Sequence, residues 1–282
     1  MQPAGRLPNF IIVGAGRSGT TSLTHYLRAH PNVFLSKQKE LHFFDNHFER
    51  GVDWYRAQFV GATSQSAVGE ATPNYLHHPD AIRRMAQVIP NARLIAVLRN
   101  PLDRAYSAYW HRRALGREPR GFEEALEGEP RTGGGDPQDS YAERSRYIEA
   151  LRRVGESFPR EALHVLLFED LTERPADTYR EVCRFLLVDD QFLPGSLGIP
   201  FNAFVGFRWL RLRHLGKRVP GWAGRILGRL NSVRGIAYPP LDPATRARLA
   251  YLFKEDNRAL AQFLGRDLTV WEESGADPEK PE

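Results

Sequence analysis

The chain has 282 residues, of which 41% are hydrophobic and 26% are charged. This length and composition argue against a disordered protein and suit a soluble globular one. The formal net charge of +5 favours anionic partners such as nucleotides, sulfated sugars, nucleic acids or membrane surfaces, with simple solubility as the alternative. The chain has one cysteine, Cys183, and its apolar run at residues 10–13 is too short for a signal peptide or a membrane span, so a cytoplasmic protein is expected.

Strands and helices are predicted to alternate along the chain. Apolar runs rich in β-branched residues predict strands at residues 10–13, 32–35, 93–98 and 163–168. Apolar residues at helical spacing predict helices at residues 20–29, 79–88, 102–111, 141–154, 176–187 and 242–264. This alternation predicts an α/β fold, in which a mostly parallel sheet carries helices on both faces. Residues 117–140 are expected to form a mobile insertion around a short helix, and residues 270–282 a frayed tail.

The stretch VGAGRSGTTSL joins the first predicted strand to the first predicted helix. Read as G-x-G-x-x-G, it uses Gly14, Gly16 and Gly19 and indicates a dinucleotide fold; read as G-x-x-x-x-G-K-[ST], it has Thr20 where the lysine belongs. In either pattern, backbone N–H groups and the positive helix end face an anion. A tight turn that only packs the strand on the helix is the alternative. Arg17 adds a fixed positive charge to the loop, which favours the anion site.

The strand predicted at residues 93–98 ends at Arg99. A nucleoside triphosphatase needs a carboxylate at the end of such a strand to hold Mg²⁺, so a cation there indicates a second bound phosphate rather than a metal. Ser107, two helical turns further on, is placed to share that anion, while a structural salt bridge of Arg99 is the alternative. The dinucleotide fold requires an acidic residue about 20 positions after the glycines, and Glu40 keeps that alternative open.

Four segments in the order GRSGTTSL, KELHFFDN, EATPNYL and LRNPLDRAYSAYW resemble the PAPS-dependent sulfotransferases, whose donor is 3′-phosphoadenosine 5′-phosphosulfate (PAPS). Within that family the chain is similar to the heparan-sulfate and bacterial carbohydrate type, and LFEDL and YPPLDPATRARL add to the likeness. The resemblance spans residues 9–268, the core of one expected domain. It implies a P-loop-like, three-layer α/β fold, adenosine 3′,5′-bisphosphate (PAP) as the product, and no required metal.

The resemblance also implies which residues hold the donor. The glycine loop would bind the 5′-phosphosulfate through Gly16, Arg17, Ser18, Gly19, Thr20 and Thr21. Arg17 stands where the family usually has a lysine and would contact the leaving group, while Arg99 and Ser107 would bind the 3′-phosphate. A later segment would close over the nucleotide through Phe207, Arg234 and Gly235.

Glu40 in KELHFFD matches the catalytic glutamate of the family and would take the proton of the acceptor. Without the resemblance it reads as a surface glutamate in a charged turn. His42 is the second catalytic candidate, as a group that orients or binds the acceptor, and His111 is the third; a lone histidine is more often structural. The acceptor cleft would also include Phe43, Glu70, Thr72, Pro73 and Tyr75. Ala71 departs from the lysine usual in the related heparan-sulfate enzymes, which argues against a highly sulfated polysaccharide acceptor.

The segment 208–234 is basic and contains two tryptophans. Three readings stay open for it: closure over the nucleotide, contact with a membrane surface or a lipid-linked acceptor, and a solvated helical face.

The sequence thus predicts a sulfotransferase that moves a sulfuryl group from PAPS to a hydroxyl or amine of a carbohydrate or other small polar metabolite. One alternative is an NAD-type oxidoreductase that uses the G-x-G-x-x-G loop. The other is a non-enzymatic basic module that binds polyanions or membranes. No recognisable nucleic-acid motif is present, so no nucleic-acid partner is expected.

Overall fold

The computed structural model describes residues 5–127, 129, 140–201, 205–207, 232–234 and 238–273. The chain divides into two compact units. The first unit comprises residues 1–100, 146–201 and 256–266, and the second comprises residues 101–145, 202–255 and 267–282.

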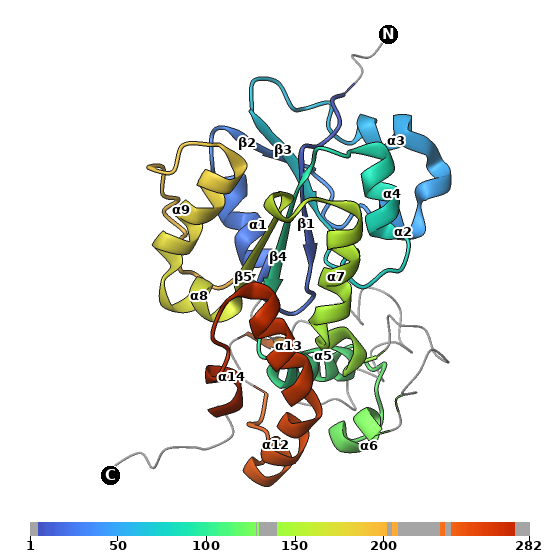
Figure 1. Cartoon of the computed structure of the whole chain (residues 1–282), viewed down its shortest axis with the longest axis vertical. Helices are drawn as coiled ribbons and strands as arrows, with labels where there is room; N and C mark the ends of the chain where they lie inside the picture. The colour runs from blue at the N-terminus through green and yellow to red at the C-terminus, as the bar shows by residue number, and fades with distance from the viewer. Residues whose placement is uncertain are drawn as a thin grey trace. The chain divides into compact units, whose positions relative to one another are not determined.

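A five-stranded sheet with the order β2-β3-β1-β4-β5 forms the centre of the first unit (Figure 1). Every neighbouring pair is parallel. The strands are β1 (Phe10–Gly14), β2 (Val33–Leu35), β3 (Ala67–Ala71), β4 (Arg93–Leu98) and β5 (Leu163–Leu167). The four strands predicted from apolar runs are therefore confirmed, and so is the α/β fold class with a parallel central sheet.

Strand β3 was not predicted, although it lies between β1 and β2. Its sequence AVGEA contains a glycine and a charged residue, which interrupt the apolar run. Both residues have structural reasons to be there. Gly69 lies opposite Phe10 of β1, and a Cβ at Gly69 would come within 2.5 Å of the Phe10 ring. Glu70 is fully buried, and three side-chain hydroxyls bond its carboxylate.

We expect the substitution Gly69→Ala to lower the free energy of unfolding by about 1–3 kcal/mol or more, because the new methyl group overpacks the sheet. The nearest obstacles include the Phe10 carbonyl oxygen at 2.6 Å, and a backbone atom cannot move aside as a side chain can. Gly155→Ala is the matched control, since a Cβ there meets nothing within 4 Å. Urea unfolding should show the control equal to or more stable than the wild type; equal stability of the two variants would contradict the packing described here.

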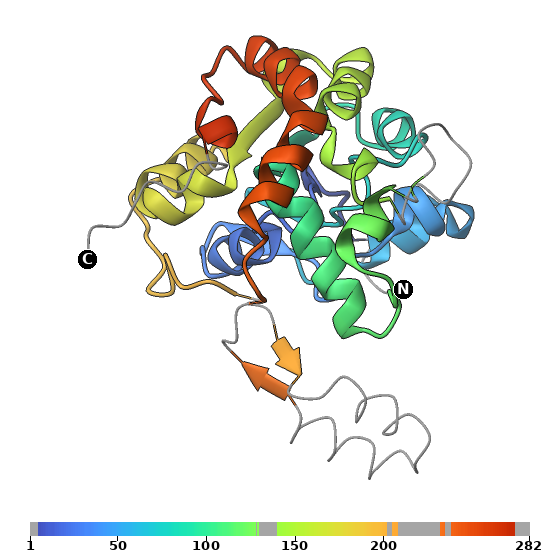
Figure 2. The ribbon, with the colours of Figure 1, turned by 90° about the horizontal axis from the view of Figure 1, so that it is seen from below.

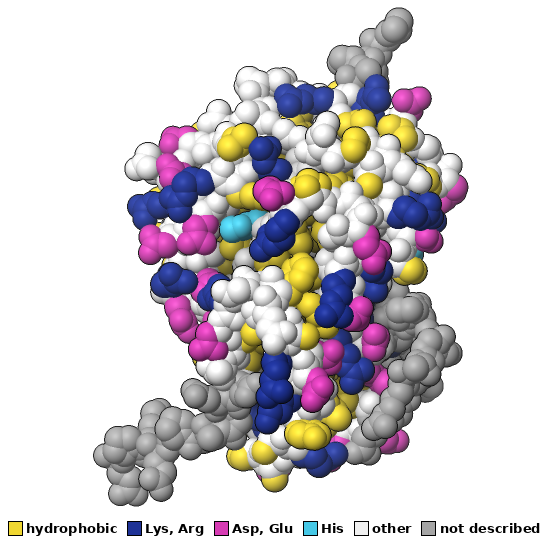
Figure 3. All heavy atoms as spheres, in the orientation of Figure 1, with side chains coloured by type: hydrophobic (Ala, Val, Ile, Leu, Met, Phe, Trp, Pro, Cys, Tyr) yellow, Lys and Arg dark blue, Asp and Glu magenta, His cyan; other side chains and the backbone are white. Residues whose placement is uncertain are grey.

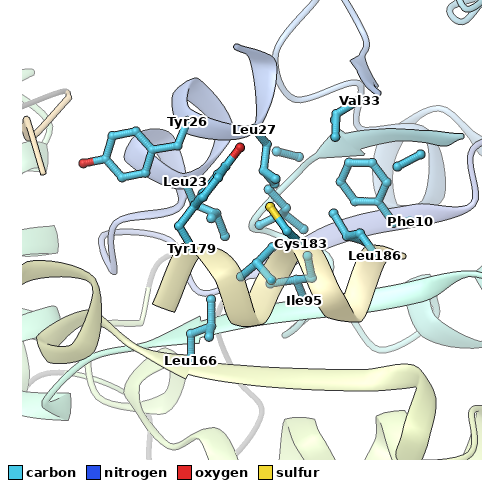
Figure 4. Close-up of a cluster of buried hydrophobic side chains, with 14 of the residues drawn as sticks. Phe10, Leu23, Tyr26, Leu27, Val33, Ile95, Leu166, Tyr179, Cys183 and Leu186 are labelled. Atoms are coloured by element: carbon cyan, nitrogen blue, oxygen red, sulfur yellow. The ribbon is translucent and has the colours of Figure 1, made fainter. Parts of the chain in front are cut away.

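Helices cover both faces of this sheet (Figure 1). One face carries α1 (Thr20–Arg28), α8 (Phe168–Glu173) and α9 (Pro175–Leu186). The other face carries α2 (Phe43–Asn46), α3 (Gly51–Ala57), α4 (Ala81–Val88) and α7 (Tyr147–Ser157). Figure 4 shows the buried cluster between α1, α9 and the sheet, whose members include Leu23, Leu27, Tyr179, Cys183 and Ile95. The predicted three layers are thus present in the first unit.

The helix predicted at residues 141–154 begins later than expected, at Tyr147. The 3-10 turn Glu143–Ser145 precedes it. The backbone carbonyl of Tyr141 accepts hydrogen bonds from the guanidinium of Arg104, at 3.0 Å, and from the hydroxyl of Ser145, at 2.7 Å. These side-chain bonds compete with the helical pattern and delay the helix.

The second unit contains α5 (Pro101–Ala114), α6 (Phe122–Glu127), a 3-10 turn (Tyr251–Phe253) and α12 (Pro243–Ala250), together with the antiparallel pair β6 (Val205–Phe207) and β7 (Ser232–Arg234), shown as arrows in Figure 2. Its core is aromatic and includes Tyr106, Tyr109, Phe122 and Phe253. Helix α6 is the short helix expected within residues 117–140.

The C-terminal prediction needs two adjustments. The helix expected at residues 242–264 is present as α12, the 3-10 turn and α13 (Lys254–Leu264). The expected frayed tail contains a short helix, α14 (Val270–Glu273), because Trp271 is buried. Most of the basic segment 208–234 lies outside the described residues, so its three readings stay predictions. Among the described helices, none is both long enough and apolar enough to cross a membrane.

Candidate active site

The glycine loop lies between β1 and α1, in the first unit. Gly19 has φ +91° directly before α1, and a Cβ there would lie 2.9 Å from the Phe168 ring. Both facts require glycine at this position. Ser18 is fully buried, and its Oγ has no hydrogen-bond partner among the described residues. A buried hydroxyl without a partner beside a helix N-terminus is what an anion site contains before its ligand binds, so the loop fits a phosphate.

Arg99 follows β4 and lies beside the same loop. Its guanidinium carbon lies over the Phe168 ring, 4.7 Å from the centroid, and the Phe168 ring in turn lines the position of Gly19. The carbonyl of Arg99 accepts a hydrogen bond from the Tyr147 hydroxyl at 2.9 Å. Phe168 belongs to the segment LFEDL but was not itself predicted as a site residue; the signal that could have found it is an aromatic residue directly after a buried strand.

The other residues predicted for the nucleotide lie in the second unit. Ser107 is buried on α5, and His111 is exposed on the same helix. Phe207 ends β6 and Arg234 ends β7, and Gly235 lies outside the described residues. A shared phosphate between Arg99 and Ser107, and closure by the later segment, stay predictions.

Glu40 and His42 lie between β2 and α2 and both adopt left-handed backbone conformations, with φ of 58° and 52°. Such conformations are uncommon for non-glycine residues and cluster at functional sites. The Nδ1 atom of His42 lies 2.8 Å from Oδ2 of Asp45, and its Nε2 atom lies 3.7 Å from Oε2 of Glu40. Asn74 donates to the same oxygen of Asp45 at 2.7 Å. A row of polar groups therefore runs from Asn74 through Asp45 and His42 to Glu40.

The two carboxylates set the charge of His42. Hydrogen bonds to Asp45 and then Glu40 raise the pKa of His42 to about 10, so the imidazole is protonated at neutral pH. The hydrogen bond from His42 lowers the pKa of Glu40, and Lys39 lowers it further against the opposing effect of burial. At neutral pH, Glu40 is thus a carboxylate that can take a proton, whereas His42 already holds one.

The protonated His42 makes stability depend on pH. Its pKa in the folded chain is above the ordinary value of 6.5, so its stabilising contribution is complete below pH 6.5 and is lost as the pH rises towards about 10. We expect the melting temperature of the wild type to exceed that of His42→Gln at pH 6 and the difference to shrink by pH 10. Thermal unfolding across this range measures the effect; a difference that does not change with pH would contradict a charged His42.

The structure corrects the role predicted for four acceptor-cleft residues. Their side chains are fully buried and bonded or packed inside the first unit: Phe43, Glu70, Thr72 and Tyr75. Burial raises the pKa of Glu70, whose carboxylate accepts hydrogen bonds from Tyr55 at 2.9 Å, Thr72 at 2.6 Å and Tyr75 at 3.0 Å. With no exposed surface, these groups do not contact an acceptor in this conformation. Pro73 is buried as well.

This buried network instead supports the segment that carries Glu40 and His42. The Phe43 backbone N–H donates to the Tyr75 hydroxyl at 2.8 Å, and the Phe43 ring stacks on Tyr55 with centroids 4.3 Å apart. The Glu40 N–H donates to the carbonyl of Ala71 at 3.2 Å. Two members of the site were not predicted from the sequence: Tyr55, whose partner Glu70 is 15 residues away, and Asp45, which pairs with His42 three residues before it and with Asn74 29 residues after it.

Lys39 joins this segment to the glycine loop. Its Nζ donates to Thr21 Oγ1 at 2.9 Å and lies 3.3 Å from Oε1 of Glu40. The candidate base and the first turn of α1 are therefore one hydrogen-bonded site. The described residues contain no cluster of three or more His, Cys, Asp or Glu side chains able to hold a metal ion.

The sheet order gives no support to the dinucleotide alternative. In that fold the strand after the first helix pairs directly with the first strand. Here β3 separates β2 from β1. The polyanion-binding alternative also gains nothing from the face in Figure 3, where Lys and Arg side chains are interspersed with Asp and Glu. Fold and site together define an α/β protein with a phosphate-type loop and a carboxylate, that of Glu40, next to it.

Residues 7–193 match the model of the sulfotransferase domain family, and the chain belongs to this family. It is 30% identical to the bifunctional heparan sulfate N-deacetylase/N-sulfotransferase 3 of Mus musculus, over 94% of this chain and 31% of that protein. It is 31% identical to the heparan sulfate glucosamine 3-O-sulfotransferase 6 of Homo sapiens, over 93% of this chain and 73% of that protein. The chain thus spans under a third of the bifunctional relative.

The crystal structure of a sulfotransferase from Alicyclobacillus acidocaldarius has the same fold. It superposes with a TM-score of 0.75 at 29% identity, covering 94% of this chain and 99% of that chain. The family and the fold predicted from the sequence are confirmed. A PAPS-dependent sulfotransferase is the class of enzyme that this family membership indicates.

Proposed function

We propose that this chain transfers a sulfuryl group from PAPS to a hydroxyl or amine of a carbohydrate or other small polar metabolite. One observation carries the proposal: Lys39 links the Glu40 carboxylate to the phosphate-type loop. The Lys39 ammonium lies 3.3 Å from Oε1 of Glu40 and donates a hydrogen bond to Oγ1 of Thr21 at 2.9 Å. A group-transfer enzyme needs a base close to the anion that it holds, whereas a binding module does not.

The loop would hold the 5′ end of the donor. The residues proposed for this contact are Gly16, Arg17, Ser18, Gly19, Thr20 and Thr21. The unpartnered hydroxyl of Ser18 supports the assignment, and Arg17 would neutralise charge on the leaving phosphate. Arg99, held over Phe168 beside the loop, is proposed for the 3′-phosphate, together with Ser107 on the strength of the resemblance alone.

Glu40 would act as the general base. It takes the proton of the acceptor O–H or N–H while the acceptor atom forms its bond to sulfur. The bond between sulfur and the bridging oxygen breaks, and its electron pair stays on the 5′-phosphate of PAP. His42 is already protonated, so we assign it to orienting Glu40 and binding the acceptor, with Asp45 and Asn74 fixing its ring.

The proposed acceptor is a sugar of low charge. The relatives named above act on heparan sulfate, as their names state, which supports a carbohydrate. Ala71 carries no charge at the position where the related heparan-sulfate enzymes usually have a lysine, so a densely sulfated chain is disfavoured. We also propose a cytoplasmic location, because a single cysteine suits a reducing compartment.

The test is PAP release from PAPS in the presence of acceptors that differ in one group. Glucosamine-containing, N-acetylated and fully sulfated oligosaccharides form the panel, with phenols as a non-carbohydrate arm. We expect turnover with an uncharged or weakly charged sugar. Turnover with phenols alone would contradict the carbohydrate acceptor, and no acceptor-dependent PAP release would contradict sulfuryl transfer itself.

A further inference from the structure

Lys39 is a cation that the sequence pattern did not assign to the donor. It lies one residue before the proposed base, and 40% of its side chain is exposed. Its Nζ donates a hydrogen bond to Thr21 Oγ1. Because Thr21 Oγ1 accepts this bond, its own hydrogen is directed elsewhere, and a phosphate oxygen in the glycine loop is a suitable acceptor.

The position of Lys39 is fixed by the backbone that follows it. The Glu40 N–H donates to the Ala71 carbonyl at 3.2 Å, so the segment passes the end of β3 at this point. Ala71 supplies no charge there. Lys39 therefore brings a positive charge to the edge of the sheet where β3 ends, on the side of the loop that faces Glu40.

We propose that Lys39 is a donor-binding residue whose ammonium contacts the 5′-phosphosulfate next to Thr21. The inference rests on the proposed sulfuryl transfer and adds one residue to its donor site. The flexible four-carbon side chain lets the ammonium turn from the Thr21 hydroxyl to a phosphate or sulfuryl oxygen while its stem stays in place. A compact cation there would meet the negative charge that grows on the bridging oxygen as the bond to sulfur breaks.

The alternative role for the same contacts is that Lys39 only neutralises Glu40. The two roles differ in what they do to nucleotide binding. If Lys39 binds the donor, it strengthens the binding of every ligand with a 5′-phosphate. If it only pairs with Glu40, it leaves nucleotide affinity unchanged and alters turnover.

The experiment is calorimetric titration of three nucleotides into the intact chain and its variants. 5′-AMP carries only the phosphate that Lys39 would contact, 3′-AMP lacks it, and PAP carries both. The variants are Lys39→Met, the conservative Lys39→Arg, and Lys37→Met as the control. Lys37 is exposed two residues away, so its substitution removes the same charge from the same segment.

We expect Lys39→Met to weaken 5′-AMP and PAP about tenfold each, as for the loss of a charge-assisted hydrogen bond, and to leave 3′-AMP unchanged. Lys39→Arg should recover most of the affinity, and Lys37→Met should match the wild type. If Lys39→Met and Lys37→Met bind 5′-AMP equally well while the wild type binds PAP, the donor-binding role of Lys39 is overturned and the sulfuryl-transfer proposal is not. A wild type that binds none of the three nucleotides would overturn the sulfuryl-transfer proposal together with it.

Discussion

The substitution Glu40→Gln is expected to lower kcat by about 10²–10⁴-fold, which is the usual contribution of a general base. The amide keeps the shape of the side chain but cannot take the proton of the acceptor. Glu40 is not part of the glycine loop and is linked to it only through Lys39. The affinity for PAP should therefore change less than kcat. Initial rates of PAP release and calorimetric PAP titration of the same preparation measure the two effects.

Glu49→Gln is the matched control for this prediction. Glu49 is a carboxylate nine residues further along whose side chain is 71% exposed, and its substitution should leave kcat unchanged. A Glu40→Gln enzyme with wild-type kcat would remove Glu40 from the chemistry. In the wild type, His42 is not available as the base at neutral pH, because Asp45 and Glu40 raise its pKa to about 10 and keep it protonated.

The substitution Arg99→Ala is expected to weaken the binding of PAP about 10- to 100-fold and to leave the affinity for 5′-AMP nearly unchanged. The effect is selective because Arg99 is proposed to bind the 3′-phosphate, which 5′-AMP lacks. Removing one partner of a charged hydrogen bond costs about 1.5–3 kcal/mol. The guanidinium is already held over Phe168, so little side-chain ordering remains to be done when the nucleotide binds. Parallel titrations with PAP and 5′-AMP measure the effect.

Arg83→Ala serves as the control for Arg99, since Arg83 is 61% exposed on α4 and pairs only with Asp80 among the contacts described. An Arg99→Ala variant that binds PAP as tightly as this control would contradict the 3′-phosphate assignment. A variant that loses PAP and 5′-AMP equally would mean that Arg99 serves the loop rather than the 3′ end.

The sequence predicted those parts of the fold whose pattern is local. Strands β1, β4 and β5 are apolar apart from Gly14, Arg93 and His164, and the glycine loop follows β1 directly, so the strands and the loop were evident. Strand β3 was not, because Gly69 and Glu70 break its pattern for reasons that lie elsewhere in the chain. Gly69 makes room for Phe10, and the Glu70 carboxylate accepts hydrogen bonds from the hydroxyls of Tyr55 and Tyr75, which lie in two other segments.

The sequence predicted which residues belong to the candidate site better than it predicted the contacts between them. The resemblance named Glu40 and His42, and the structure brings them within 3.7 Å of each other. It also named Glu70 and Tyr75 for the acceptor, but hydrophobicity patterns do not reveal that both are fully buried. The link from Thr21 through Lys39 to Glu40 depends on how two loops meet, which no local pattern encodes.

The most direct test of the proposed PAPS site is a thermal-shift titration of the intact chain with PAP, 5′-AMP, ATP with Mg²⁺, and NAD. A ligand that binds only the folded state raises the melting temperature by mass action. We expect a larger rise with PAP than with 5′-AMP at equal concentration, and no comparable rise with NAD. A rise with NAD alone, or with none of the four, would contradict a PAPS site at the glycine loop.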